Sequence, residues 1–225
     1  VDHERSVQAV NINTDQAWVV LYVKRWLTAP LQRADGTLEK RDRGTPQGSA
    51  ISPVLANLYL HYAFDTFLER EFPTVEFERY ADDAVVHCAT ERQAHHVWAA
   101  LAERMEGVGL RLHPGKTKVV YCKDKRRRGS FAGTSFTFLG YTFQPRAAPD
   151  RSGGLTVGFL PAGSAHALTK MSEQIRRWRL HLRTGLTLEE LAETINPIVA
   201  GWMQYYGRFY RSALSPILQR INTYL

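Results

Sequence analysis

The sequence is poor in cysteine and has no long apolar run. Its two cysteines, Cys88 and Cys122, lie far apart and neither belongs to a C-x-x-C pair, which excludes a disulfide framework and a cysteine-rich zinc site. No apolar stretch approaches the roughly 18 to 20 residues of a membrane span, and the first ten residues are too polar for a signal peptide. Internal repeats and low-complexity tracts are also missing. We therefore expect a soluble, unsecreted chain in a reducing compartment, with no membrane partner.

The charge is divided unevenly along the chain. The 225 residues suffice for one large domain or two small ones, and a hydrophobic content of 44% excludes a disordered chain. Residues 1–109 hold 11 Lys or Arg and 16 Asp or Glu, a net charge of −5, whereas residues 110–225 hold 18 and 6, a net charge of +12. The basic half, with its interleaved aromatic residues, favours a nucleic-acid partner, and the acidic half is a natural place for metal-binding carboxylates.

The N-terminal part has the patterns of a mixed α and β structure. Apolar residues at helical spacing predict a helix that Thr14 caps and that ends before Pro30. The pair Asp35-Gly36 then predicts a hairpin. Ser52 followed by Pro53 predicts the cap and first turn of a long buried helix.

A pair of adjacent aspartates stands inside a strand-like segment. Residues 77–89, FERYADDAVVHCA, are apolar on both sides of the pair, which predicts two strands joined by a tight turn at Asp82-Asp83. Such a turn projects two carboxylates, and hard oxygen ligands suit Mg²⁺, which can bridge to substrate phosphates. Asp-Asp is also common as plain turn chemistry, so the pair alone does not distinguish the two interpretations.

Caps and periodicity predict the remaining elements. The capping-box spacing of Thr90 and Gln93 predicts a helix that Gly107 and Gly109 terminate. Strands are predicted at 136–143 (FTFLGYTF) and 157–160, and linkers at 123–133 and 144–154. The chain is then wholly helical, with helices beginning at Ala167, at Thr187 with Glu190 (bent at Pro197), and at Ser215-Pro216.

These motifs together resemble the reverse transcriptases encoded by group II introns, also called intron maturases. YADD, at residues 80–83, is preceded by RGTPQGSAISPVLANLYL and followed by GLRLHPGKTKVVYC and FTFLGYTF, in the family's order and spacing. INPIVAGWMQYYGRFYRSAL resembles the family's maturase-specific thumb, which retron and diversity-generating reverse transcriptases do not share. The resemblance implies an α+β fold, with an antiparallel polymerase palm and packed helices at residues 1–145 and a small all-helical thumb at 146–225.

The resemblance also implies the chemistry of the aspartate pair. It implies an RNA-directed DNA polymerase that uses two Mg²⁺ ions, deoxynucleoside triphosphates, an RNA template and a DNA primer, and that binds intron RNA in the bacterial cytoplasm or an organelle. Asp82 would be the principal metal ligand with Asp83 in support. Ala81 matches the small residue that lets the primer end approach.

Further positions match the nucleotide-binding side of the family's site. Gln47 and Gly48 match a PQG segment under the templating base and incoming nucleotide, where glycine permits close backbone approach. Ser49 departs from the family's second glycine. Lys116, in HPGKTK, matches a lysine that donates a proton to the leaving pyrophosphate, and Lys118 is the alternative.

Two other sets of residues point to the nucleic acid itself. Leu139, Gly140 and Tyr141 match the hairpin that grips the primer strand, with a plain core strand as the competing interpretation. Basic residues at helical spacing predict a stripe that follows a phosphate backbone, and others flank an aromatic pair. The stripe is Arg176, Arg179 and Arg183, and the flanking residues are Arg208 and Arg211. The alternatives are a solvated helix face and core aromatic residues.

Two functions stay open at this stage. Members of the family need a further catalytic aspartate from a strand ahead of the first residue here, as well as a fingers domain, so we expect a fragment that is catalytically incomplete alone. Its parent would be the polymerase of a mobile intron. The alternative is an RNA-binding splicing cofactor that does not polymerise. The sequence does not indicate an oligomeric state.

Overall fold

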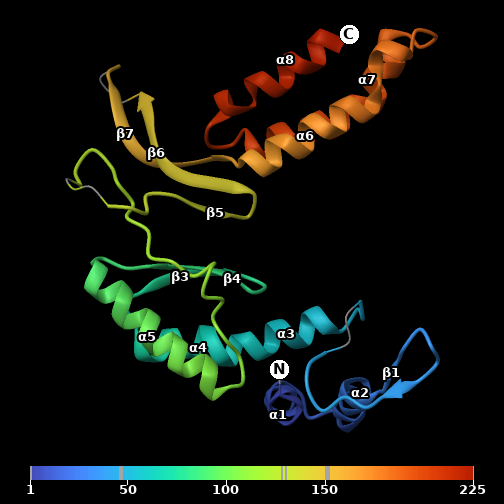
Figure 1. Ribbon diagram of the computed structural model, residues 1–225, viewed down its shortest axis with the longest axis vertical. Coiled ribbons are helices and arrows are strands. Elements are labelled where there is room, and N and C mark those ends of the chain that lie inside the picture. Colours follow the sequence, from blue (N-terminus) through green and yellow to red (C-terminus); the bar gives the residue numbers. More distant parts are fainter. Residues whose placement is uncertain (1, 46–47, 128, 130, 150–152, 225) are drawn as a thin grey trace. The chain divides into compact units, whose positions relative to one another are not determined.

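The computed structural model in Figure 1 describes residues 2–45, 48–127, 129, 131–149 and 153–224. It has an α+β fold with antiparallel sheets, as predicted. The chain forms two compact units, residues 1–119 and 120–225. The domain boundary expected after residue 145 stays a prediction. Within the described ranges no helix is both long and apolar enough to cross a membrane.

The first unit begins with two helices and a short hairpin. Helix α1 (His3–Asn13) starts where the Asp2 side chain accepts a hydrogen bond from the Arg5 amide, and α2 (Ala17–Thr28) follows. The prediction that Thr14 caps α2 is wrong, because its amide donates to Val10 and so ends α1, while Gln16 is the cap of α2. The predicted hairpin is confirmed as β1 (Leu31–Gln32) paired with β2 (Leu38–Glu39).

A long helical segment follows and contains a π turn. It comprises α3 (Ser52–Leu60), the π turn η1 (His61–Asp65) and α4 (Thr66–Glu71). Pro53 lies in the first turn as predicted, but the cap is Ile51, because Ser52 is already helical. Two adjacent residues of the π turn, Ala63 and Phe64, are buried, and the turn accommodates the step of five residues from Tyr59 to Phe64. The buried positions of the whole segment are Leu55, Tyr59, Ala63, Phe64 and Leu68.

The helical segment and a second helix cover one face of a hairpin. Strands β3 (Glu76–Tyr80) and β4 (Asp83–His87) are antiparallel, and α5 (Glu91–Gly107) starts at Thr90, whose hydroxyl accepts from the Gln93 amide as predicted. In Figure 1, α4 and α5 lie on the same side of this hairpin. Their shared core includes Tyr59, Phe64, Leu68, Val97, Leu101 and Met105, with Phe77 and Val86 of the hairpin packed against it.

The second unit begins with an antiparallel sheet of order β5-β6-β7. Its strands are Phe136–Phe138, Tyr141–Pro149 and Leu155–Gly163. The single strand predicted over 136–143 is wrong, because the chain reverses at Leu139-Gly140, where φ is 49° and 79°. Two consecutive positive φ values form the type I′ turn that suits a two-residue hairpin. The linker predicted at 144–154 is also wrong over 144–149, which belong to β6, whereas the strand predicted at 157–160 is confirmed within β7.

The helical part of the second unit closes on its own core. It comprises α6 (Ala165–Trp178), the 3₁₀ turn η2 (Leu180–Leu182), α7 (Leu188–Tyr206), the 3₁₀ turn η3 (Arg211–Leu214) and α8 (Ser215–Tyr224). The predicted capping box of α7 is confirmed, and α8 packs along α6 (Figure 1). The buried residues are Ala167, Met171, Ile175, Trp178, Leu180, Leu191, Ile195, Leu214, Ile217 and Ile221.

Candidate active site

The aspartate pair lies at the tip of the β3–β4 hairpin, here called the YADD hairpin (residues 76–87). Tyr80 pairs with Asp83, so the loop consists of Ala81 and Asp82. The turn was predicted one residue too late, because Asp83 is already the first residue of β4. Ala81 has a φ of 54°, and a positive φ in a two-residue loop matches the right-handed twist of the flanking strands. This backbone leaves both Asp82 and Asp83 exposed.

The donor chemistry of the pair fits a hard cation as part of a larger coordination sphere. Mg²⁺ is commonly held by one or two carboxylates together with waters and substrate phosphates. Within the part of the chain that the structure describes, no group of three or more His, Cys, Asp or Glu residues could hold a metal ion. Asp82 and Asp83 supply two adjacent carboxylates, which are donors of the type that Mg²⁺ binds.

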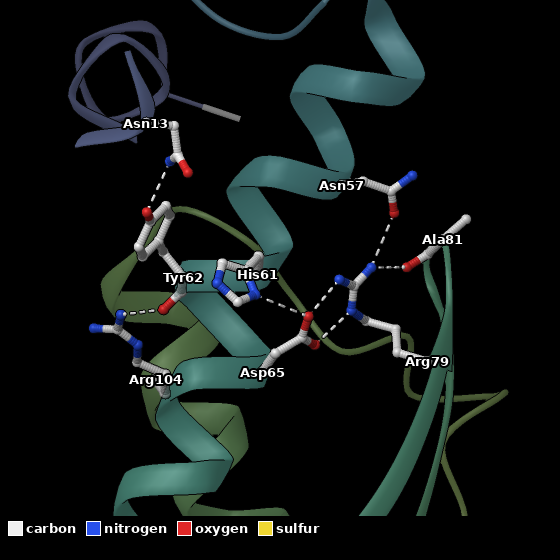
Figure 2. Close-up of polar contacts among 8 residues, drawn as sticks. All are labelled: Asn13, Asn57, His61, Tyr62, Asp65, Arg79, Ala81 and Arg104. Carbon is white, nitrogen blue, oxygen red and sulfur yellow. Dashed lines mark hydrogen bonds and ion pairs between the residues drawn. The ribbon is translucent and has the colours of Figure 1, made fainter. Parts of the chain in front are cut away.

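A half-buried arginine supports the hairpin from its inner face (Figure 2). Arg79 lies on the same face of β3 as Phe77, which packs on the core. Its Nε and Nη2 atoms donate to the two carboxylate oxygens of Asp65, both at 2.6 Å. The side chains of Arg79 and Asp65 are only 12% and 16% exposed. Their hydrogen bond raises the pKa of Arg79, whereas burial opposes the rise, so the guanidinium is firmly charged.

The same guanidinium reaches the turn. Its Nη1 atom donates to the Asn57 side-chain oxygen at 3.0 Å and to the Ala81 carbonyl at 2.9 Å. Sequence reasoning missed Arg79, Asp65 and Asn57. One signal was present, because strand alternation places residue 79 on the inward face with Phe77, and an inward charged residue needs a buried partner.

The π turn that carries Asp65 has supports of its own. The Thr66 amide donates to the His61 carbonyl, which is the i→i+5 bond of a π turn. Arg104 of α5 donates to the carbonyls of Tyr62 and Ala63, at 3.1 and 3.3 Å. The Tyr62 hydroxyl accepts from the Asn13 side chain at 2.8 Å (Figure 2). Contacts from α1 and α5 thus hold the part of the helix that faces Arg79.

The residues predicted to contact the nucleotide are located in part. Gln47 lies outside the described residues. Gly48 has a φ of 81°, and a Cβ there would meet nothing within 4 Å, so glycine is required by the backbone rather than by lack of space. Lys116 is exposed in the turn at 114–116, and Lys118 is exposed two residues later. The roles assigned to these residues stay predictions.

The predicted primer-grip residues form a turn that tyrosines of α7 hold. The Tyr205 hydroxyl donates to the Leu139 carbonyl at 2.9 Å, and the Tyr141 hydroxyl donates to the Tyr205 carbonyl. A Cβ at Gly140 would lie 2.8 Å from the Tyr206 hydroxyl. Burial raises the pKa of Tyr141 and of Tyr206. Tyr141 is therefore a core residue of this junction, whereas Leu139 is exposed at the tip.

The predicted arginine stripe does not form. Helix α6 ends at Trp178, and Arg179 adopts a left-handed conformation with a φ of 47°. Arg183 lies beyond the 3₁₀ turn that follows, so the helical spacing breaks after Arg176. Arg176 and Arg179 still share a shallow hollow with His181 and Tyr224. Whether these arginines bind nucleic acid stays a prediction.

The aromatic pair between Arg208 and Arg211 has two different environments. Both arginines are exposed. Phe209 is 60% exposed, although its ring packs edge-on against the Tyr141 ring, with 5.6 Å between the ring centroids. Tyr210 instead donates to the Ala147 carbonyl of β6 at 3.3 Å. Phe209 is thus the member of the pair that presents surface to a ligand.

Two family models match the chain. Residues 2–143 match the model described as reverse transcriptase (RNA-dependent DNA polymerase), and residues 168–225 match that described as group II intron, maturase-specific domain. The first match covers more than half of the chain and includes the YADD hairpin and the turn at Leu139-Gly140. The second includes α7 and α8. A comparison with curated proteins gives no match.

Proposed function

The chain belongs to the reverse transcriptases of group II introns, which carry a maturase-specific domain, and on this premise we propose that it supplies the catalytic aspartate pair of a polymerase that extends a DNA primer on an RNA template. The observation that supports the proposal best is the YADD hairpin. Its two-residue loop exposes adjacent carboxylates, while the Ala81 carbonyl in that loop accepts a hydrogen bond from the half-buried Arg79. Rigid presentation of hard oxygen ligands is what nucleotidyl transfer requires of its protein component.

The proposed roles follow from this arrangement. Asp82 and Asp83 would hold Mg²⁺ together with substrate phosphates. When bound, a pair of such ions activates the primer hydroxyl and stabilises the leaving pyrophosphate. Ala81 keeps the approach to the carboxylates open, because its side chain is a single methyl group. Lys116 would protonate the pyrophosphate, with Lys118 as the alternative.

The second unit would hold the nucleic acid. Residues 120–225 hold 15 Lys or Arg and 6 Asp or Glu, a net charge of +9, and arginines on such a surface contact phosphates without reading sequence. The turn at Leu139-Gly140 would contact the primer strand, and Arg176, Arg179, Arg183, Arg208 and Arg211 would contact the duplex or intron RNA. Binding through these residues should weaken steeply as salt rises, because phosphate contacts release counterions.

Primer extension tests the polymerase proposal. We would compare the complete protein, here called the parent, with its Asp82→Asn variant on an RNA template with a DNA primer, in the presence and absence of Mg²⁺. The matched control is Asp35→Asn, which changes an exposed carboxylate in the turn of another hairpin of the same unit. We expect Mg²⁺-dependent extension by the complete protein and by its Asp35→Asn control, and none by Asp82→Asn. Extension by Asp82→Asn at the parent's rate contradicts the proposal.

A second candidate function is splicing assistance without polymerisation. The match of residues 168–225 to the maturase-specific domain favours it. In this case neither the parent nor Asp82→Asn would extend a primer, and both would promote splicing of a group II intron transcript equally. Replacement of Arg176, Arg179 and Arg183 by glutamine should then weaken RNA binding and splicing together. Splicing that fails in Asp82→Asn, while its RNA binding persists, would argue against this candidate.

A further inference from the structure

The loop of the YADD hairpin has a backbone that needs support. Ala81 has a Cβ and yet adopts a φ of 54°, a conformation that non-glycine residues avoid. A strained residue of this kind persists where its surroundings hold it in place. The Ala81 carbonyl is the acceptor of the hydrogen bond from Arg79 Nη1 at 2.9 Å, so the support comes from a side chain two residues back on β3.

The position of Arg79 is fixed in turn by the helical segment behind it. Asp65 binds one edge of the guanidinium, through Nε and Nη2, and Asn57 binds the Nη1 atom that also reaches Ala81. Asn57 and Asp65 are eight residues apart, which on an uninterrupted α-helix would place them about 80° out of line. The π turn at 61–65 takes up one extra residue. It therefore brings the two acceptors to the same face, where both meet Arg79 (Figure 2).

We propose that Arg79, held by Asp65 and Asn57, is the positioning residue of the YADD turn: it fixes the Ala81 carbonyl and thereby sets where the Asp82 carboxylate points. The inference rests on the proposed function of Asp82 as a metal ligand. It differs from a purely structural role, in which the pair fastens the hairpin to the helix. A fastening contact needs charge and burial, whereas positioning also needs the planar fork that spans Asp65 and Ala81 at once.

The test separates these two roles with conservative variants. Arg79→Lys keeps the charge but cannot make the same set of bonds, and Asp65→Asn keeps the shape but removes the charge that orients the fork. The matched control is Arg33→Lys on the β1–β2 hairpin, where Arg33 also makes two bonds to one carboxylate, that of Glu39, at 2.9 and 2.6 Å. All variants would be made in the full chain.

Two measurements are made on each variant by nuclear magnetic resonance. The first is the ¹³Cα and ¹³Cβ shifts of Ala81, which report its backbone conformation without any metal or substrate. The second is the Mn²⁺ concentration at which paramagnetic broadening reduces the intensity of the Asp82 and Asp83 amide signals to one half. We expect Arg79→Lys and Asp65→Asn to move the Ala81 shifts toward ordinary negative-φ values and to raise the Mn²⁺ concentration about tenfold, as is common when a group that orients a metal ligand is lost. Arg33→Lys should change neither.

Unchanged Ala81 shifts in Arg79→Lys and Asp65→Asn, with the signals of the α5 core intact, would overturn the inference. If one of these variants loses the α5 signals, the Ala81 shifts of the other variant test the inference. If both variants lose them, the contact between Arg79 and Asp65 is needed for folding and the inference is wrong. Failure of the proposed function has a different signature. In that case Mn²⁺ does not broaden Asp82 selectively in the parent, while the shifts of Ala81 still report whether Arg79 sets the turn.

Discussion

Replacing Gly140 by alanine tests how tightly the turn at Leu139-Gly140 is packed against α7. Gly140 has a φ of 79°, and an added Cβ would lie 2.8 Å from the Tyr206 hydroxyl and 3.4 Å from a ring carbon of the same tyrosine. Gly153 is the matched control in the same unit, because its φ is 83° and its Cβ would meet nothing within 4 Å. The two substitutions therefore share the backbone strain and differ in the steric contact.

The expected loss in the free energy of unfolding is the sum of the backbone strain and the steric contact. A left-handed conformation costs a residue with a Cβ about 1–2 kcal/mol, and the stiffer unfolded chain returns about 0.4–1 kcal/mol. Gly153→Ala should therefore destabilise the second unit by about 1 kcal/mol. Gly140→Ala must also displace Tyr206, and overpacking costs about 1–3 kcal/mol, so the total is about 2–4 kcal/mol. For a unit of this size each kcal/mol corresponds to about 4–8 °C in melting temperature.

Hydrogen exchange of peptides within residues 165–178, followed across a urea series, measures the stability of the second unit by itself. We expect Gly140→Ala to unfold at distinctly lower urea than Gly153→Ala. The double variant Gly140→Ala, Tyr206→Phe should recover part of the loss, because it removes the hydroxyl that is nearest to the new methyl group. Equal destabilisation by the two alanine variants, or no recovery in the double variant, would refute the steric argument.

Three further predictions concern the core, a helix cap and the thiols. Leu68 is completely buried, so Leu68→Ala should destabilise the first unit by about 2–5 kcal/mol in urea unfolding, and a loss below 1 kcal/mol would contradict its place in the core. Thr187→Ala removes one half of the α7 capping box and should cost about 1 kcal/mol, visible as faster amide exchange in the first turn of α7 and not in α5. Burial raises the pKa of Cys88 and of Cys122, so at neutral pH less thiolate is present than in an ordinary cysteine, and iodoacetamide should alkylate the folded chain more slowly than the urea-unfolded one. The alkylation rate of the folded chain should still be rising with pH above about 8.5, where an ordinary thiol is half ionised. Equal rates in the folded and unfolded chains would show that burial does not act on these thiols.

Elements with short-range signals could be predicted from the sequence. The caps at Thr90 and Thr187, and the start at Ser215-Pro216, depend on residues within one turn of each other. The two adjacent aspartates were also found, because the alternation of the flanking strands marks the turn to within one residue. Thr14 lies between two helices, and the sequence does not indicate which of them it bounds. In the structure its amide donates to the Val10 carbonyl, so it ends α1.

Features that depend on contacts between distant residues could not be predicted. The bond between Arg79 and Asp65 joins a strand to a helix fourteen residues earlier, and no local pattern encodes it. The run FTFLGYTF is rich in aromatic and β-branched residues and therefore has the pattern of a single strand, although the chain reverses at Leu139-Gly140. The hydrogen bond from Tyr205 to the Leu139 carbonyl, across 66 residues, holds that turn. Arg179 likewise ends α6 inside a pattern that continues to look helical.

The π turn at 61–65 has a consequence for how this chain is compared with its relatives. Ala63 and Phe64, four and five residues after Tyr59, are both buried, and the next buried position is Leu68, four residues after Phe64, so the turn shifts the phase of the buried pattern by one position. A relative that lacks the extra residue would form a plain α-helix and still bury the corresponding side chains in the same order. Its sequence would then align with this one only if a gap of one residue is allowed inside a helix, a place where alignments normally forbid gaps.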